Sequence, residues 1–170
     1  MKNNSEIPES KMKISPYEPI FGIILSISLT ILFLGFPQVL RISWESIWIP
    51  VFDTGVVRGL WLPILLWAIL EIAAEVMKLV ERQYTMRLAS VIVIISVLQV
   101  VFAVVVFGNS NILNPEFISH MESINTNSGA IGSIFNAMIM RPNLVIMAVL
   151  LIVLFFETLD VVVKAFRSKR

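Results

Sequence analysis

Four long runs of apolar residues, separated by shorter polar segments, divide the chain into alternating stretches. The runs cover residues 20–40, 59–79, 88–108 and 143–163. Each has the length of about 20 residues that an α-helix needs to cross the hydrocarbon core of a bilayer. The pattern therefore predicts an all-α polytopic membrane protein, built as a bundle of four transmembrane helices.

Polar segments flank this region at both ends. In residues 1–19, Pro16 and Pro19 disfavour a helix before the first run, so we expect a disordered tail there. Residues 20–163 are the expected membrane domain, and residues 164–170 are a short basic tail. A cleaved secretory signal is the alternative for the first run, but no compact basic segment precedes it and no convincing cleavage site follows it. We expect this helix to be retained.

The 13 Lys and Arg residues are unevenly distributed among these segments. Ten lie in the two tails and the turn between the second and third runs, and three lie in the other two connections. The ten are Lys2, Lys11, Lys13, Lys78, Arg82, Arg87, Lys164, Arg167, Lys169 and Arg170; the three are Arg41, Arg58 and Arg141. Because positive charge is retained on the cytoplasmic side, we expect a multi-pass protein of the cell membrane with both termini in the cytoplasm.

The two outer connections also carry apolar residues at helical spacing. In the first, Ile42, Trp44, Ile47, Trp48 and Val51 indicate a short helix lying on the membrane surface. In the second, the Asn-Pro pair at residues 114–115 is typical of a helix start, and apolar residues follow at one face, with a second such segment at residues 131–138. We expect these interfacial helices to cover the outer end of the bundle or to present a partner or ligand surface.

Composition narrows the possible functions. Apolar residues make up 57% of the chain and charged residues only 15%, whereas soluble domains carry roughly 25% charge. The net charge of +1 and the absence of Cys argue against nucleic-acid binding, disulfides and thiol chemistry. The single histidine, His120, has too few neighbouring ligands for a metal site, and no catalytic or cofactor motif occurs. The sequence predicts no enzyme, cofactor or metal.

Acidic residues inside two of the apolar runs are the most informative positions. Glu71 lies near the middle of the second run, and Glu157 lies toward the inner end of the fourth. An acidic residue at the centre of a membrane helix costs about 2.5–3.5 kcal/mol on insertion scales, so these carboxylates should face protein or water.

Their spacing places acids and bases on common helix faces. The second run and its end carry Glu71, Glu75, Lys78 and Arg82; the fourth carries Glu157, Asp160, Lys164 and Arg167. Steps of three or four residues make each set one stripe, acid deep and base shallow. Either the stripes pair only to satisfy their charges, or they form a proton or cation path. Their equal seven-residue offset, from Glu71 to Lys78 and from Glu157 to Lys164, also raises the alternative of a duplicated helical hairpin.

Small residues recur along the first run. Gly22, Ser26 and Thr30 are spaced by four and form a groove that lets another helix approach closely. We expect this groove to serve helix packing.

Residues 49–89, IPVFDTGVVRGLWLPILLWAILEIAAEVMKLVERQYTMRLA, show a family likeness. The Pro-Val-Phe at the outer boundary, the Lys-Leu-Val at the helix end and the aromatic before Met-Arg-Leu-Ala resemble the membrane region that follows the HAAS domain in small membrane proteins of Gram-positive bacteria. The resemblance implies a sensory or regulatory role in the bacterial cytoplasmic membrane. The preceding tail is too short for the cytoplasmic HAAS domain itself, and no functional residue is carried over.

Together these features predict a non-enzymatic integral membrane protein with a regulatory, sensory or assembly role. Its expected partners are the lipid bilayer and other membrane proteins or further copies of itself. The alternative is a small transporter or permease subunit in which membrane-embedded carboxylates couple to protons or cations.

Overall fold

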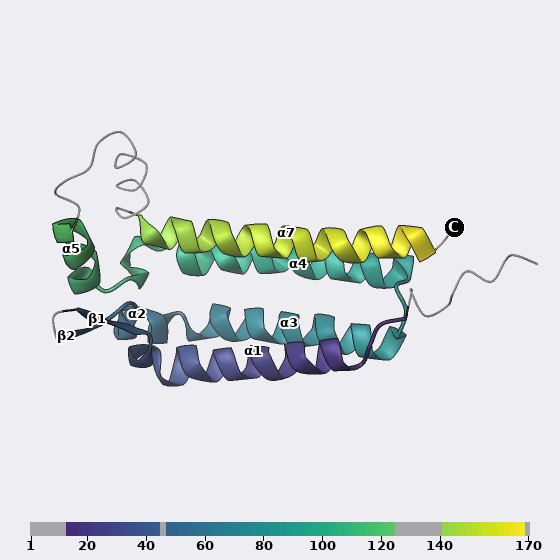
Figure 1. The fold of residues 1–170 in the computed structure, drawn as a ribbon, viewed down its shortest axis with the longest axis horizontal. Coiled ribbons are helices and arrows are strands. Elements are labelled where there is room, and N and C mark those ends of the chain that lie inside the picture. Colours follow the sequence, from purple (N-terminus) through teal and green to yellow (C-terminus); the bar gives the residue numbers. More distant parts are fainter. Residues whose placement is uncertain (1–12, 45–46, 125–140, 169–170) are drawn as a thin grey trace, which may run out of the picture.

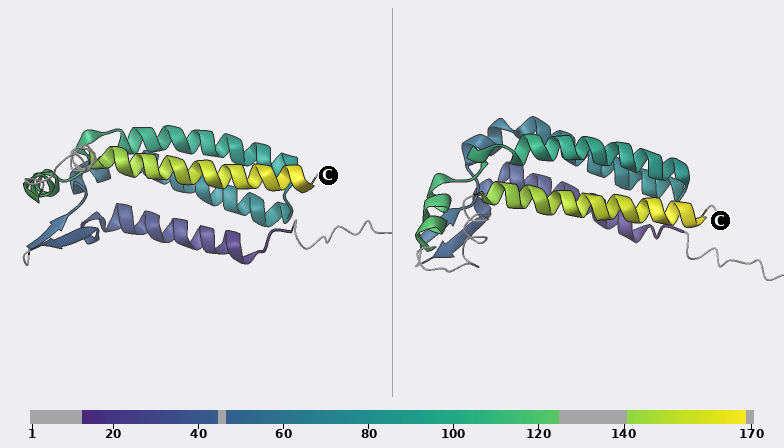
Figure 2. Two further views of the ribbon diagram at one scale, coloured as in Figure 1. Left: turned by 45° about the horizontal axis from the view of Figure 1, so that its top comes forward. Right: turned by 90° about the horizontal axis from the view of Figure 1, so that it is seen from above.

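Four long, antiparallel helices lie side by side along the whole length of the molecule in the computed structural model (Figure 1). The structure describes residues 13–44, 47–124 and 141–168. The long helices are α1 (Tyr17–Gly35), α3 (Trp61–Glu81), α4 (Met86–Phe107) and α7 (Pro142–Ser168). Contacts follow chain order: α1 packs on α3, α3 on α4, and α4 on α7. The N-terminal helix pair, α1 and α3, thus packs on the C-terminal helix pair, α4 and α7, through α3 and α4, and in the left view of Figure 2 α1 (purple) lies apart from α4 and α7.

In the part of the chain that is described, three helices are long and apolar enough to cross a membrane: α1, α4 and α7. The fourth expected span, α3, has 21 residues but carries Glu71, Glu75 and Lys78 within them. The expected helical class is therefore confirmed, together with three of the apolar helices, whereas the fourth crossing stays a prediction.

The first helix begins earlier than expected. α1 starts at Tyr17, with Pro16 at its N-cap and Pro19 in its first turn. Proline is compatible with this turn because the first backbone N–H groups of a helix have no intrahelical acceptor. Before the helix, the Ile14 N–H donates to the Arg82 carbonyl at 3.0 Å and the Ile14 side chain is buried. Residues 13–19 are thus ordered, and the rest of the expected tail lies outside the described residues.

A tight turn at the same end joins α3 to α4. Arg82 follows α3 in the left-handed conformation, with φ of 53°, and its N–H donates to the Lys78 carbonyl. The Thr85 hydroxyl then caps α4 by accepting from the Leu88 N–H at 3.1 Å. Two residues, Gln83 and Tyr84, suffice between these caps, so α3 and α4 lie next to each other and antiparallel.

The first outer connection is a β-hairpin, and the expected surface helix there is wrong. β1 (Arg41–Trp44) pairs antiparallel with β2 (Ile47–Pro50), with Ile42 opposite Ile49. β-Branched and aromatic residues favour a pleated strand over a helix, and Pro50 cannot continue a helix. The apolar positions fit both periods, and strand propensity decides between them. A short 3-10 helix, η2 (Pro37–Val39), precedes the hairpin.

Among the described residues, two short helices also lie at this end of the molecule. α2 (Thr54–Gly59) begins at Asp53, whose carboxylate accepts from the Val56 N–H at 2.9 Å. α5 (Pro115–Ile124) starts where the Asn-Pro pair predicts, and the Asn114 side chain accepts from the Glu116 N–H at 2.9 Å. The helix start expected at residues 114–115 is confirmed, and the second apolar segment, 131–138, lies outside the described residues.

Backbone hydrogen bonds join the two outer connections to each other. Phe52 and Leu113 form an antiparallel bridge. On either side of it, the Asp53 N–H donates to the Ile112 carbonyl at 2.9 Å and the Asn114 N–H donates to the Val51 carbonyl at 3.0 Å. We call this set of contacts the outer clasp. It links the N-terminal helix pair to the C-terminal helix pair through main-chain atoms, next to the 3-10 helix η3 (Ser110–Ile112).

Two apolar cores lie at opposite ends of the helices. One packs Phe52, Val57, Val106, Phe107 and residues of η3 beneath the outer clasp. The other packs Ile14, Tyr84 and Val161 with neighbouring residues of α3 and α4 at the α3–α4 turn. Between them, polar side chains contribute to the contacts between the helices as well.

Candidate functional site

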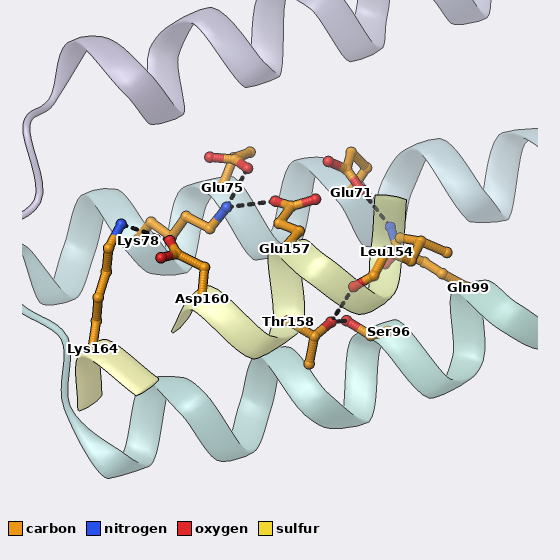
Figure 3. A network of polar contacts seen from close by, with 10 residues as sticks. All are labelled: Glu71, Glu75, Lys78, Ser96, Gln99, Leu154, Glu157, Thr158, Asp160 and Lys164. Atoms are coloured by element: carbon orange, nitrogen blue, oxygen red, sulfur yellow. Dashed lines mark hydrogen bonds and ion pairs between the residues drawn. The ribbon is translucent and has the colours of Figure 1, made fainter. Parts of the chain in front are cut away.

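Four charged side chains converge at the middle of the helices: Glu71, Glu75 and Lys78 of α3, and Glu157 of α7 (Figure 3). We call this set the charge cluster. The Lys78 ammonium donates to Glu75 Oε1 at 2.6 Å and to Glu157 Oε1 at 2.9 Å. A single lysine therefore joins an acid of its own helix to an acid of the other helix pair.

Helical spacing accounts for the α3 half of this arrangement. Glu71, Glu75 and Lys78 are separated by four and three residues, which places them on one face. Glu75 and Lys78 are buried, with only 5% and 6% of their surfaces exposed, because this face packs toward the interior. Glu71 is the central residue of α3, so the cluster begins at mid-length and continues toward the α3–α4 turn.

Glu71 does not contact Lys78 in this arrangement; it is bound by α4. The Gln99 amide donates to a carboxylate oxygen of Glu71, and Gln99 is buried. Nothing in the sequence assigns Gln99 this role, although it is the one strongly polar side chain of the third apolar run. A buried amide at the centre of such a run requires a hydrogen-bond partner, and that requirement is the signal that points to it.

A second polar contact joins α4 to α7 beside the charge cluster. The Thr158 and Ser96 hydroxyl oxygens share a hydrogen bond at 2.7 Å, and Thr158 also lies 2.7 Å from the Leu154 carbonyl oxygen. These neutral groups hold α7 against α4 on the side next to Glu157. The position of Glu157 is thereby fixed by its own helix pair.

The remaining residues of the two predicted stripes lie apart from the cluster. Asp160 and Lys164 pair with each other at 2.6 Å on the partly exposed face of α7, where Lys164 also lies 4.9 Å from the Tyr84 ring. Arg82 ends α3 in its left-handed conformation. Lys78 and Lys164, which have the same offset from Glu71 and Glu157, thus have different surroundings. The duplication expected from that offset stays a prediction.

The small-residue groove on α1 meets α3 at one point and opens into a cavity beyond it. A Cβ atom at Gly22 would lie 2.9 Å from Glu75 Cδ, so the glycine gives the Glu75 side chain its space. Ser26 and Thr30 line a cavity of about 400 Å³ between α1, α3, α4 and α7. Glu71 and Glu157 lie on its wall as well. The groove therefore contributes to both helix packing and a cavity.

The charge cluster contains more acid than base. Oxygen atoms of Glu71, Glu75 and Glu157 all lie within 4.8 Å of one another, and Lys78 is the base that contacts two of them. Glu75 Oε2 is buried and has no hydrogen-bond partner among the described residues. With every group ionised, the cluster holds three negative charges and one positive charge. Such a site can take up a cation or protons.

Comparison with models of protein families, with characterised proteins and with solved structures finds no match to this chain. The site is therefore interpreted from its own geometry.

Proposed function

We propose that this chain is a non-enzymatic integral membrane protein of four transmembrane helices that acts as a sensory or regulatory component through partner proteins. The observation that carries the proposal is the Lys78–Glu157 ion pair, which joins the two helix pairs between mid-length and the α3–α4 turn.

The placement of α3 is supported by where its charges point. Glu75 and Lys78 are buried within the protein, so lipid contacts the other faces of the helix, which expose Leu62, Ile69 and Val76. At 1.5 Å per residue α3 is about 31 Å long, matching a hydrocarbon core of about 30 Å. A charged residue enclosed by protein costs far less than one facing lipid. We therefore take α3 as the fourth span.

The orientation follows from the basic residues. The α3–α4 turn, with Arg82 and Arg87, lies at the same end as the C-terminus of α7, with Arg167 (Figure 1). Retention of positive charge on the cytoplasmic side puts this end inside the cell. The β-hairpin and α5 then lie outside.

The proposed sensory role depends on the ion pairs of the charge cluster, which connect the two helix pairs. α1 and α7 are held together through α3 and α4 and through the charge cluster, where one ammonium bridges two carboxylates. Protonation of a carboxylate, or a cation that competes with Lys78, weakens this bridge and favours a different spacing of the helix pairs. A ligand shifts such an equilibrium by its difference in affinity for the two arrangements. Partners at the cytoplasmic ends of α1 and α7 would then detect the change.

The test measures the spacing of the helix pairs directly. The chain lacks Cys, so spin labels can be attached to single cysteines at Tyr17 of α1 and Phe166 of α7, both of which are exposed. In lipid nanodiscs, Glu157→Gln is expected to lengthen or broaden the distance distribution from pulsed electron paramagnetic resonance. Asp160→Asn, which removes an acid one turn away that pairs with Lys164, is the matched control and should leave it unchanged. Identical distributions for Glu157→Gln and the parent chain would contradict the proposal.

Transport is the second candidate function, and the cavity favours it. Glu71 and Glu157 line an open cavity of about 400 Å³ whose wall is formed by all four long helices, and carboxylates at membrane depth often mark substrate or proton paths. Transport requires that this space open to water on each side in turn. A sensory role requires only that the cluster change its occupancy.

A further inference from the structure

The wall of the cavity combines aromatic and aliphatic side chains with a few polar atoms. Phe33 of α1, Trp67 of α3 and Phe107 of α4 contribute rings, and most of the remaining wall is aliphatic. The Trp67 and Phe107 rings lie edge to face with centroids 6.2 Å apart. The Thr30 hydroxyl already donates to the Ser26 carbonyl at 2.7 Å, so it offers a ligand only an acceptor. The volume of about 400 Å³ falls within the range of small-molecule sites.

The charges on the wall have one sign. Glu71 and Glu157 line the cavity, and Lys78 pairs with Glu157 and with Glu75, which is not part of the wall. Trp67 precedes Glu71 by four residues, so the indole ring and the carboxylate lie on the same face of α3. Aromatic rings beside a carboxylate are the groups that recognise an organic ammonium ion, through cation–π contact and charge.

Among the described residues, one oxygen atom of the cluster lacks a hydrogen-bond donor. The Glu75 side chain is only 6% exposed, and its Oε2 atom has no hydrogen-bond partner in the described part of the chain. Glu75 belongs to the same group of three carboxylates, each of which has an oxygen within 4.8 Å of the others. A buried carboxylate oxygen without a donor is costly, and a cation bound among the three acids would lower that cost.

An organic cation fits this site better than a metal ion. Ca²⁺ takes six to eight oxygen ligands and Mg²⁺ demands an octahedron, whereas the three carboxylates already share their oxygens with Lys78 and Gln99. The cavity wall is apolar and provides little to replace the remaining ligands. Lys78 itself shows what the acids accept, because it is a primary ammonium ion on an alkyl chain.

We propose that the cavity between α1, α3, α4 and α7 binds a monovalent amphiphilic organic cation, an amine or quaternary ammonium on an apolar body, with its charge against Glu71 and Glu157. The apolar body lies among the rings of Phe33, Trp67 and Phe107, and the charged group completes the balance of the cluster. This inference names a ligand for the proposed sensory site and rests on the proposed function only for the placement of the four helices in a bilayer.

The experiment uses the full chain in nanodiscs of neutral phosphatidylcholine, which excludes binding to anionic lipid. Isothermal titration calorimetry compares benzyltrimethylammonium with neopentylbenzene, its uncharged isostere. We expect saturable binding of the cation with one site per chain, and at least tenfold weaker binding after Glu71→Gln or Glu157→Gln. Asp160→Asn, which changes an acid outside the cavity, is expected to bind as the parent chain does.

A second variant separates loss of the site from loss of the fold. Ala68→Phe fills the cavity, which Ala68 lines, while leaving every charge in place, and it should also abolish binding. Thermal unfolding of each variant shows whether the fold is kept. Equal binding of the uncharged isostere would overturn the proposal, as would unchanged affinity in both Gln variants and Ala68→Phe. Binding of Ca²⁺ or Mn²⁺ by a chain that does not bind the organic cation would replace it with a metal site.

The binding experiment and the spin-label experiment can fail separately. If the cation does not bind, the sensory role is still tested by the spin-label distances of Glu157→Gln and the parent chain, which are measured without ligand. If the cation binds but the spin-label distances are the same with and without it, the binding site is supported and the sensory role is contradicted.

Discussion

Lys78 joins the two helix pairs. Its ammonium bonds two carboxylates from different helix pairs, and 8% of its side chain is exposed. Lys164, at the corresponding offset on α7, is 40% exposed and pairs within its own helix. Removing one partner from a buried ion pair costs about 3–5 kcal/mol, whereas an exposed pair contributes at most about 1 kcal/mol. Although the two lysines have the same offset from an acid, we expect the ion pairs of Lys78 to contribute more to the free energy of unfolding than that of Lys164.

Replacement of Lys78 tests this difference. Lys78→Met keeps the length and apolar stem but leaves three carboxylates facing one another, so we expect the free energy of unfolding to fall by about 3 kcal/mol. Lys164→Met is the matched control and should change it by less than about 1 kcal/mol. Reversible unfolding in mixed micelles measures both. Equal decreases in the free energy of unfolding of the two variants would show that the burial of Lys78 does not make its ion pairs more stabilising.

Gly22 allows a second prediction at the level of the residue. Gly22→Ala places a Cβ atom 2.9 Å from Glu75 Cδ, and Glu75 is pinned by Lys78, so we expect a loss of about 1–3 kcal/mol from overpacking. Gly35→Ala, at a position with no atom within 4 Å, is the control and should change stability by less than about 0.5 kcal/mol. The same unfolding assay decides. A neutral Gly22→Ala variant would mean that α1 moves away from α3 at little cost.

The helices and their ends were largely predictable from the sequence, because apolar runs and capping residues are local signals. The predicted start at residues 114–115 coincides with α5, and the third and fourth runs match α4 and α7 to within a few residues, apart from the longer C-terminal end of α7. The β-hairpin at residues 41–50 was not predicted, because its apolar positions suit a helical period as well as a strand. A four-residue strand has too few positions to separate these periods.

The charge cluster was predictable only in part. Spacing along α3 gave the common face of Glu71, Glu75 and Lys78, since that relation is local. The pairing of Lys78 with Glu157, rather than of Lys164 with Glu157, depends on how α7 packs against α4. The Ser96–Thr158 contact, the Gln99–Glu71 contact and the cavity arise from the same long-range packing. No pattern within one helix specifies them.

For the molecule as a whole, the bilayer placement makes a prediction about access. Single cysteines at Ser43 on the β-hairpin, Gln83 in the α3–α4 turn and Ser119 on α5 replace exposed residues. In intact cells, a membrane-impermeant maleimide is expected to label the cysteines at 43 and 119, and to label the one at 83 only after permeabilisation.

Positions 43 and 83 are separated by a single long helix, α3. Comparing their labelling therefore tests whether α3 crosses the membrane. Labelling of both from the same side would remove α3 from the membrane and contradict the four-span arrangement. The pair at 83 and 119 tests α4 in the same way, and it serves as the positive control because α4 meets the length and composition of a spanning helix.

The outer clasp lies at one end of the molecule, far from the C-terminus of α7. Main-chain hydrogen bonds hold the two helix pairs together at their outer end, next to where α7 begins at Pro142. Along α7, Glu157 lies about 22 Å from Pro142 and Ser168 about 39 Å from it, at 1.5 Å per residue. If the C-terminal helix pair turned as a unit about this end, a displacement at Glu157 would be almost twofold larger at Ser168.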